Sequence, residues 1–508
     1  MAAWVAASAG DPKASLWLVI GFAAVHGALW TLVLSNLKAA QDVHMDVAEA
    51  FAWGQKFQFG YGKHPPLAGW VAGLWFKIFP VADWSTYALA MTTLGCGLVI
   101  CWLIALRVVD RRRAFFVVVM LALYPIFNFK GFKYNPDLLQ LVTLPLLVLA
   151  YLHAFEKRSV CAGLWLGLAG ALALMTKYWV LTMIGAVGLA ALIHPARLLF
   201  LRSPAPWVAI ATLVLAMTPH LWWLRQVDFV PLTYAGDVYG LQSRAQNLQL
   251  VLGYIGHNLA LLALPAGIAA VVLAWRRQPF AFVAHGANAS VKVSQALNIW
   301  IIQSVVAVGP PLGALIFTVY MKTDWGISLF FLTPLALVAI PALRVRKIAL
   351  FHIVAVWLVI TLAALGASPL IAAYEMQRNP NASNTYASRS TLARELTEAW
   401  RARFKTRWAV VAGTTEIGEP MTFYSADHPA PFTPGEVWSS GLTSLEEAKR
   451  LGFIGICDTT DYRLPTCEAW MEANAPDAER LAITTQRFFH GAAGPSTLWK
   501  VYIVPPGK

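Results

Sequence analysis

The ionisable residues between Asp42 and Trp70 are the first place in this chain to look for chemistry. The segment reads DVHMDVAEAFAWGQKFQFGYGKHPPLAGW and directly follows an apolar run long enough to cross a bilayer. Ionisable groups beside such a run are costly unless they pair or serve a site, so a functional cluster is expected here. Asp46 and Glu49 are three residues apart, which places both carboxylates on one face of a helix. Asp46 suits the general base of a proton transfer, with Glu49 as the group that orients it.

Basic side chains in the loops on this side are the candidates for binding a phosphate. Lys63 lies in the first loop, Lys133 in the stretch NFKGFKYNPD, and Lys177 at the end of an apolar run. Arg225 begins the later loop RQVDFVPLTYAGDVYG. A cation beside a phosphate neutralises the charge that grows as the phosphate leaves. Snorkelling toward lipid headgroups is the alternative role for Lys177, and it is the favoured one for Lys130.

Other polar residues carry weaker signals. Tyr61, His64 and Asp237 are the loop residues expected to contact an acceptor. His64 and His257 are the candidate metal ligands, although two histidines far apart in sequence are more often structural. The need for a divalent metal stays open, and no motif for zinc, ATP or dinucleotide binding indicates another cofactor.

The elements that must hold these residues are membrane-spanning helices. Of the 508 residues, 58% are hydrophobic and only 13% are charged, a composition typical of a polytopic membrane protein. Apolar runs that can cross roughly 30 Å of hydrocarbon recur about eleven times, with up to thirteen allowed. They lie near 16–36, 84–107, 114–128, 137–155, 160–176, 178–194, 206–224, 247–274, 296–320, 326–342 and 348–373.

Clusters of arginine and lysine set the predicted orientation. With a cytoplasmic N-terminus, every even-numbered connection carries its cluster on the inside, as the positive-inside rule requires. The clusters are Arg107 with Arg111 to Arg113, Lys157 with Arg158, Arg197 with Arg202, Arg276 with Arg277, and Arg344 with Arg346 and Lys347. The net charge of +13 then follows from topology and requires no nucleic-acid partner. No cleavable signal sequence is evident, so the first run is expected to remain as a span.

The opposite side is expected to carry the first loop, 38–83, and a soluble C-terminal domain. The membrane domain is predicted to cover 1–373 and the soluble domain 374–508. The latter begins with the polar helical pattern SRSTLARELTEAWRARF and continues through short apolar runs such as FIGICD and LWKVYIV, which predicts a small α/β domain. A disulfide between Cys457 and Cys467 is permitted there, but a spacing of ten residues does not establish it.

The order of motifs on this side resembles the polyprenyl-phosphate-dependent glycosyltransferases of the GT-C fold. The acidic cluster of the first loop is followed by Gly60-Tyr61 and then by the sequence HPPL. KYNPD, ending at Asp137, is similar to a loop that presents a second catalytic Asp, and MTKY to a Thr-Lys-Gly at a span end. The segment 325–334 is similar to the family's Trp-to-Pro helix start. Within the fold the chain is most similar to the branch of families 39 and 83, related to protein O-mannosyltransferases and to the aminoarabinose transferase of lipid A.

The resemblance extends over roughly residues 15–345 and departs from the family pattern at two places. The family has two adjacent acids, whereas this chain has Val47 after Asp46, so Glu49 is the candidate for the second carboxylate. Relatives that modify lipid A have a Glu-Lys-Pro sequence where this chain reads Lys63-His64-Pro65-Pro66, which displaces the phosphate-binding lysine. For Asp137, Asn135-Pro136 also reads as a plain helix start, but the resemblance favours a catalytic carboxylate.

The resemblance implies an inverting glycosyltransferase of the bacterial inner membrane, with a cytoplasmic N-terminus and a periplasmic C-terminal domain. It would move one hexose or pentose from a polyprenyl monophosphate to lipid A, a core glycan or another envelope lipid or glycan. A protein O-glycosyltransferase of the same fold is the alternative for the acceptor. A flippase or transporter of lipid-linked sugars is the alternative class, but its ionisable residues should lie near the membrane midplane. A non-catalytic assembly subunit is disfavoured by the three acids.

Overall fold

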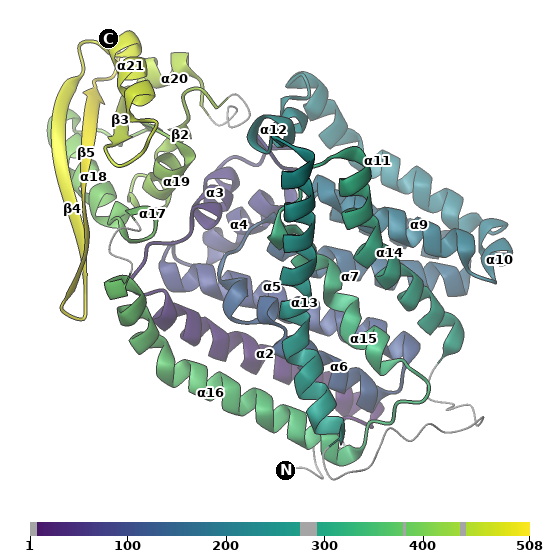
Figure 1. Cartoon of the computed structure of the whole chain (residues 1–508). Coiled ribbons are helices and arrows are strands. Elements are labelled where there is room, and N and C mark those ends of the chain that lie inside the picture. The colour runs from purple at the N-terminus through teal and green to yellow at the C-terminus, as the bar shows by residue number, and fades with distance from the viewer. Residues whose placement is uncertain (1–7, 275–291, 379–382, 437–442, 508) are drawn as a thin grey trace.

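The computed structural model describes residues 8–274, 292–378, 383–436 and 443–507, except for the side chains of residues 235–238 and 383–384. A bundle of helices forms the larger part of the molecule, and a smaller domain with a β-sheet lies at one end of it (Figure 1). Within the described residues, seven helices are long and apolar enough to cross a membrane. They are α2 (Pro12–Leu37), α5 (Asp83–Val108), α7 (Pro136–Lys157), α11 (Pro204–Gln226), α13 (Arg244–Ala274), α14 (Val293–Phe317) and α16 (Lys347–Arg378). The predicted class, a polytopic helical membrane protein, is confirmed.

The other four predicted spans are shorter or bent. The run at 114–128 becomes α6 (Arg111–Leu123) followed by the 3₁₀ segment Pro125–Phe132, with a bend of 79° between them. Proline has no N–H for the helical ladder, which explains a break at this position. The remaining three runs form α8 (Val160–Leu174), α9 (Leu181–Ile193), and the 3₁₀ helix η4 (Thr323–Leu332) continued by α15 (Thr333–Val338). Length alone therefore does not assign these four as full spans.

Small residues bring α8 and α11 into close contact. A Cβ added at Gly163 would lie 2.5 Å from the carbonyl oxygen of Ala205, and one at Gly167 would lie 2.5 Å from that of Ala209. Small residues four apart on facing helices allow backbones to approach in a membrane, where dispersion and not the hydrophobic effect drives packing. The contact fixes α8, whose C-terminal end leads directly to Lys177.

The C-terminal domain contains a five-stranded mixed sheet with the order β2-β1-β3-β5-β4. β1 pairs in parallel with β2 and β3, whereas β5 is antiparallel to both β3 and β4. The strands are β1 (Val410–Ala412), β2 (Ala430–Phe432), β3 (Phe453–Asp458), β4 (Glu479–Phe489) and β5 (Ala492–Val504), and the helices are α17 (Ser383–Tyr386), α18 (Arg389–Phe404), α19 (Thr415–Tyr424), α20 (Leu445–Leu451) and α21 (Leu464–Asn474). Residues of α18 and α19 share one apolar core with the sheet, and residues of α20 and α21 share another. The predicted small α/β domain is confirmed.

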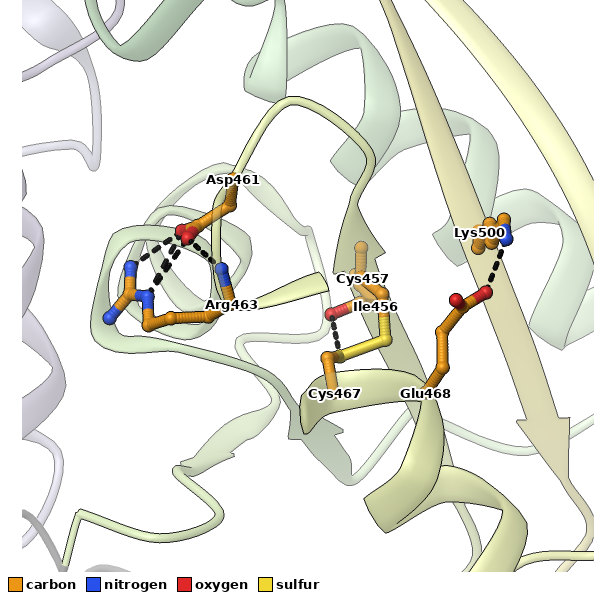
Figure 2. The surroundings of a disulfide bond; sticks show 7 residues. All are labelled: Ile456, Cys457, Asp461, Arg463, Cys467, Glu468 and Lys500. Atoms are coloured by element: carbon orange, nitrogen blue, oxygen red, sulfur yellow. Dashed lines mark hydrogen bonds and ion pairs between the residues drawn. A yellow bond between two sulfur atoms is a disulfide. The ribbon is translucent and has the colours of Figure 1, made fainter. Parts of the chain in front are cut away.

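A disulfide joins the end of β3 to α21 (Figure 2). Cys457 and Cys467 are paired, with their Cα atoms 5.9 Å apart. Beside the disulfide, Lys500 of β5 forms an ion pair with Glu468, so a second link ties the same helix to the sheet. The pairing that the sequence spacing leaves open is decided by the fold, because β3 and α21 pack against each other.

The C-terminal domain packs onto the first loop of the membrane domain. The Asp42 carboxylate accepts a hydrogen bond of 2.8 Å from the backbone N–H of Arg389, and the Val43 N–H donates to the Tyr424 hydroxyl at 2.7 Å. Helix α19 also packs against α3 (Met45–Gly54), the helix of the first loop. The loop and the domain therefore lie on the same side of the helical bundle.

Candidate active site

A cavity of about 590 Å³ lies where the first loop, the start of α7 and the segment before η4 meet. Helix α3 begins at this cavity because the His44 side chain caps it, accepting from the Asp46 N–H at 3.1 Å. Asp46 and Glu49 both line the cavity, as their spacing on one helix face predicts. The lining includes six of the residues that the sequence predicts for the site: Asp46, Glu49, Lys63, His64, Asp137 and Lys177.

Asp46 is held in place by three neighbours. Its Oδ2 accepts from Asn135 Nδ2 at 2.8 Å and lies 3.4 Å from Lys133 Nζ, while Oδ1 lies 3.6 Å from His44 Nδ1. Burial alone would favour the neutral acid, but the charges of Lys133 and Lys63 and the hydrogen bond from Asn135 outweigh it and lower the pKa of Asp46 far below its ordinary value. The side chain keeps 22% exposure. An ionised carboxylate is thus presented to the cavity in a fixed orientation.

Glu49 and Lys63 form a buried ion pair in the same cavity lining as Asp46. Their charged atoms are 2.6 Å apart, and the two residues are only 4% and 9% exposed. Burial raises the pKa of Glu49 to about 7, against the opposing charge of Lys63 and with a further contribution from Asp46. Burial disfavours the ammonium of Lys63, but the adjacent Glu49 carboxylate outweighs this and raises the pKa of Lys63. Lys63 is therefore charged, with much of that charge already compensated by Glu49.

Asp137 forms a second ion pair at the start of α7. Lys177 Nζ lies 2.6 Å from Asp137 Oδ1, and Gln140 Nε2 donates to the same oxygen at 3.2 Å. Asn135 caps the helix, accepting from the Leu138 N–H at 2.9 Å. The sequence NPD is thus a helix start that also delivers a carboxylate to the cavity, so the two interpretations of Asp137 are compatible.

Aromatic rings form another part of the cavity lining, the aromatic wall. Tyr239 stacks on Tyr320 with centroids 5.0 Å apart and meets the edge of Trp325 at 5.4 Å. Lys63 lies 5.6 Å from the ring centre of Tyr234, in helix α12 (Val230–Val238). Aromatic side chains offer large, rigid apolar surface with few torsions to freeze. The lining therefore places charged groups close to aromatic rings, since Lys177 also lies 5.7 Å from the ring centre of Trp325.

Lys322 differs from the other lysines of the cavity lining. Lys63 and Lys177 are each bound to a carboxylate, whereas Lys322 forms no ion pair with the residues that the structure describes. It precedes η4 and borders the aromatic wall. Its positive charge is thus the least compensated in the lining.

Some of the predicted residues lie elsewhere. Lys133 contacts Asp46 without belonging to the lining, and Tyr61 is buried against Trp53, its hydroxyl donating to the Lys56 carbonyl. Arg225 is exposed near the end of α11, outside the lining. The side chain of Asp237 lies outside the described residues.

The two candidate metal ligands occupy different surroundings. His64 is half-buried in the cavity wall, and desolvation together with the charges of Lys177 and Lys63 lowers its pKa well below the ordinary value. His257 instead lies 3.2 Å from Lys130 and 3.3 Å from Asp324, outside the cavity lining. Among the described residues no group of three or more His, Cys, Asp or Glu side chains is arranged to hold a metal ion.

Three features of the site have no counterpart in the sequence interpretation. Asn135 reads as a helix cap, but its amide also binds Asp46. Tyr234 is placed by α12, and Tyr239 and Tyr320 by connecting segments, and none of these carries a motif. Glu419, on α19 of the C-terminal domain, is buried close enough to Glu49 for the two charges to interact, across 370 residues of sequence. No local pattern could have indicated that contact.

Comparison with known proteins identifies the fold. Residues 63–223 match the family described as dolichyl-phosphate-mannose-protein mannosyltransferase. Over 245 residues the chain is 27% identical to the lipid A galacturonosyltransferase RgtD of Rhizobium johnstonii, covering 45% of this chain and 47% of that protein. The chain thus matches about half the length of this curated relative. ArnT from Cupriavidus metallidurans, solved bound to undecaprenyl phosphate, superposes with a TM-score of 0.59 at 12% identity, over 98% of this chain and 100% of that one.

This chain has the GT-C fold. The match extends through the C-terminal domain, because nearly the whole of both chains is covered. The predicted resemblance to relatives of protein mannosyltransferases and of lipid A glycosyltransferases is confirmed.

Proposed function

We propose that this protein is a membrane glycosyltransferase that moves one sugar from a polyprenyl monophosphate to a lipid A-type acceptor. The observation that carries the proposal is a cavity lined by an ionised, oriented Asp46, by lysines and by aromatic rings. The printed activity of RgtD supports a lipid A acceptor, and the lipid bound to ArnT supports a polyprenyl-phosphate donor.

Asp46 is proposed as the general base. In the transfer, the bond between the anomeric carbon and the phosphate oxygen breaks, a bond from the acceptor oxygen forms on the opposite face of the sugar, and the acceptor proton passes to the carboxylate. Asp46 is more accessible than Glu49, whose side chain is 6% exposed and bound to Lys63. Asn135 and Lys133 keep Asp46 ionised and oriented, and Glu49 acts as a positioning residue through Lys63.

The lysines are proposed to bind the donor phosphate. Lys322 has the least compensated charge, so it is the first candidate for the group that leaves with two negative charges. Lys63 and Lys177 can turn from their carboxylates toward the phosphate when the donor enters. The aromatic wall then offers apolar surface to the first isoprene units and to the sugar ring.

The reaction is proposed to occur on the periplasmic face of a bacterial inner membrane. The C-terminal domain packs on the first loop beside the cavity, so both lie on one side of the membrane. The disulfide Cys457–Cys467 in that domain is typical of an oxidising compartment. The arginine clusters follow the positive-inside rule for the same orientation.

The test is a comparison of lipid A from cells with and without the gene. Mass spectrometry should show the loss of one sugar residue from lipid A, restored by the intact gene and not by the Asp46→Asn variant. An unchanged lipid A together with the loss of a sugar from envelope proteins would move the acceptor to protein hydroxyls, the acceptor named for the matching family. An unchanged envelope with mislocalised lipid-linked sugar would contradict the enzyme and favour a flippase.

A further inference from the structure

A second cavity, of about 810 Å³, lies far from the candidate active site. It is formed by the turn between α5 and α6, the start of α14 and the segment before α16. Six cationic side chains and one carboxylate line it: Arg111, Arg112, Arg113, Lys292, Arg344 and Arg346, with Asp110.

This basic cavity lies on the membrane side opposite to the active site. Helix α5 begins at Asp83, after the first loop, and reaches the cavity at its other end, about 39 Å away for a helix of 26 residues. Helix α16 begins beside Arg346 and leads to the C-terminal domain after 32 residues. Figure 1 shows α16 extending from the end that bears the N label to the end that bears the β-sheet domain.

Arg113 is a buried side chain of the cavity lining, held in one orientation by its neighbours. The residue is 5% exposed, its Nη2 donates to the Leu343 carbonyl at 2.6 Å, and its Nε lies 3.4 Å from Asp110 Oδ2. Its Nη1 is buried without a hydrogen-bond partner among the described residues. A buried guanidinium N–H without an acceptor is costly, so an anion that accepted a hydrogen bond from Arg113 would stabilise this side chain.

The charges of the cavity are not balanced by its own acid. Asp110 already caps α6, accepting from the backbone N–H groups of Arg112 and Arg113 at 3.0 and 3.1 Å. Arginines that served only to set the orientation of the chain in the membrane would need no common cavity, and their side chains would extend separately into solvent. Here the five arginines and Lys292 come from three separate segments and line one cavity. Bringing like charges together is unfavourable unless an anion joins them.

We propose that the basic cavity binds the phosphate of an anionic phospholipid headgroup in the leaflet opposite to the active site. The planar guanidinium group of arginine can donate two parallel hydrogen bonds to the oxygens of one phosphate, so several arginines around one cavity suit a phosphate ligand. Leu106, Val109 and Val345 line the same cavity, so apolar surface for glycerol and the first acyl carbons lies next to the charges. Basic pockets between spanning helices on the cytoplasmic side are suited to such headgroups. Inorganic phosphate or a soluble phosphate ester could bind the same arginines. The experiment therefore distinguishes a lipid phosphate from a soluble phosphate.

The experiment compares two double variants of the full chain in detergent. Arg344→Gln with Arg346→Gln removes two charges from the cavity, and Arg197→Gln with Arg202→Gln removes two from a connection outside its lining. Thermal unfolding is followed while phosphatidylglycerol, cardiolipin, phosphatidylcholine or glycerol 1-phosphate is added. We expect the two anionic lipids to stabilise the wild type and the control variant, and the cavity variant to need about tenfold more lipid for the same shift.

Three outcomes would overturn the proposal. Equal lipid dependence of the two double variants would leave the arginines with a role in topology alone. Equal stabilisation by glycerol 1-phosphate at the same concentration would assign the cavity to a soluble phosphate. A photoreactive phosphatidylglycerol probe tests the site on the wild-type protein, so the result does not depend on whether a variant folds. Its crosslinks should map to residues 106–113 or 344–346. Crosslinks confined to other segments would contradict the site.

Discussion

Asp46 is an ionised carboxylate whose neighbours fix its orientation, and its role can be tested by removing the charge alone. Asp46→Asn keeps the size of the side chain, so we expect the turnover number to fall about a hundredfold or more with no loss of folded protein. The measurement is transfer of labelled sugar by purified enzyme, with thermal unfolding of each sample. The matched control is Asp477→Asn, on the exposed surface of the C-terminal domain, which should transfer normally. Near-normal transfer by Asp46→Asn would instead favour Glu49 or Asp137 as the base.

Lys63 and Lys322 both line the cavity but differ in their partners, so their loss should have different effects. Lys63→Met leaves the carboxylate of Glu49 buried without its partner, and we expect a loss of unfolding free energy of about 3 kcal/mol. The double variant Lys63→Met with Glu49→Gln should recover most of that stability. Lys322→Met breaks no ion pair among the described residues, so it should leave stability unchanged and raise the KM for the donor about tenfold. A normal donor KM in Lys322→Met would indicate that Lys63 and Lys177, and not Lys322, bind the donor phosphate.

At the scale of elements, the contact between α3 and α19 contains acids that are harder to ionise than usual. Burial, followed by the charge of Glu49, raises the pKa of Glu419 well above its ordinary value, and burial also raises the pKa of Glu49 to about 7. The folded state therefore binds more protons than the unfolded chain above pH 4.5, and its stability falls as the pH rises from there toward 7. The packing of the C-terminal domain on the first loop should be tightest in mildly acidic solution.

Replacing Glu419 tests this pH dependence. Glu419→Gln cannot ionise, so we expect an apparent melting temperature higher than that of the wild type by roughly 2–4 °C at pH 8 and little different at pH 5. Glu395→Gln, on the exposed face of α18, is the matched control and should follow the wild type at both values. If the melting temperatures of the wild type and of Glu419→Gln change with pH in parallel across this range, ionisation of Glu419 does not destabilise the folded state.

At the scale of the whole molecule, the proposed roles of both cavities depend on which side of the membrane each one faces. The candidate active site and the β-sheet domain lie at one end of the spanning helices, and the basic cavity lies at the other. Alkaline phosphatase is active only where it is exported, so a fusion after Lys508 should be active and a fusion after Arg202 should be silent, at equal amounts of fusion protein by immunoblot. The reverse pattern would invert the proposed faces of both cavities.

The sequence by itself determined the membrane class, most of the long spans and the grouping of the polar loops. These depend on properties that are local along the chain: apolar runs about as long as a bilayer is thick, and clusters of arginine between them. The spacing of Asp46 and Glu49 likewise placed both on one face of α3, because helical periodicity needs no tertiary contact. The small α/β domain followed from short apolar runs after a polar helix.

Only the tertiary structure decided which charges meet. Lys177 binds Asp137 and Lys63 binds Glu49, while Lys322, which lines the same cavity, forms no ion pair within the described residues. Arg225 lies outside the cavity although its loop is on the predicted side. The disulfide was likewise left open by spacing and settled by the packing of β3 on α21. Such pairings depend on distances of a few ångströms between segments that are often far apart in sequence, and these distances are set by helix packing, which composition and periodicity do not specify.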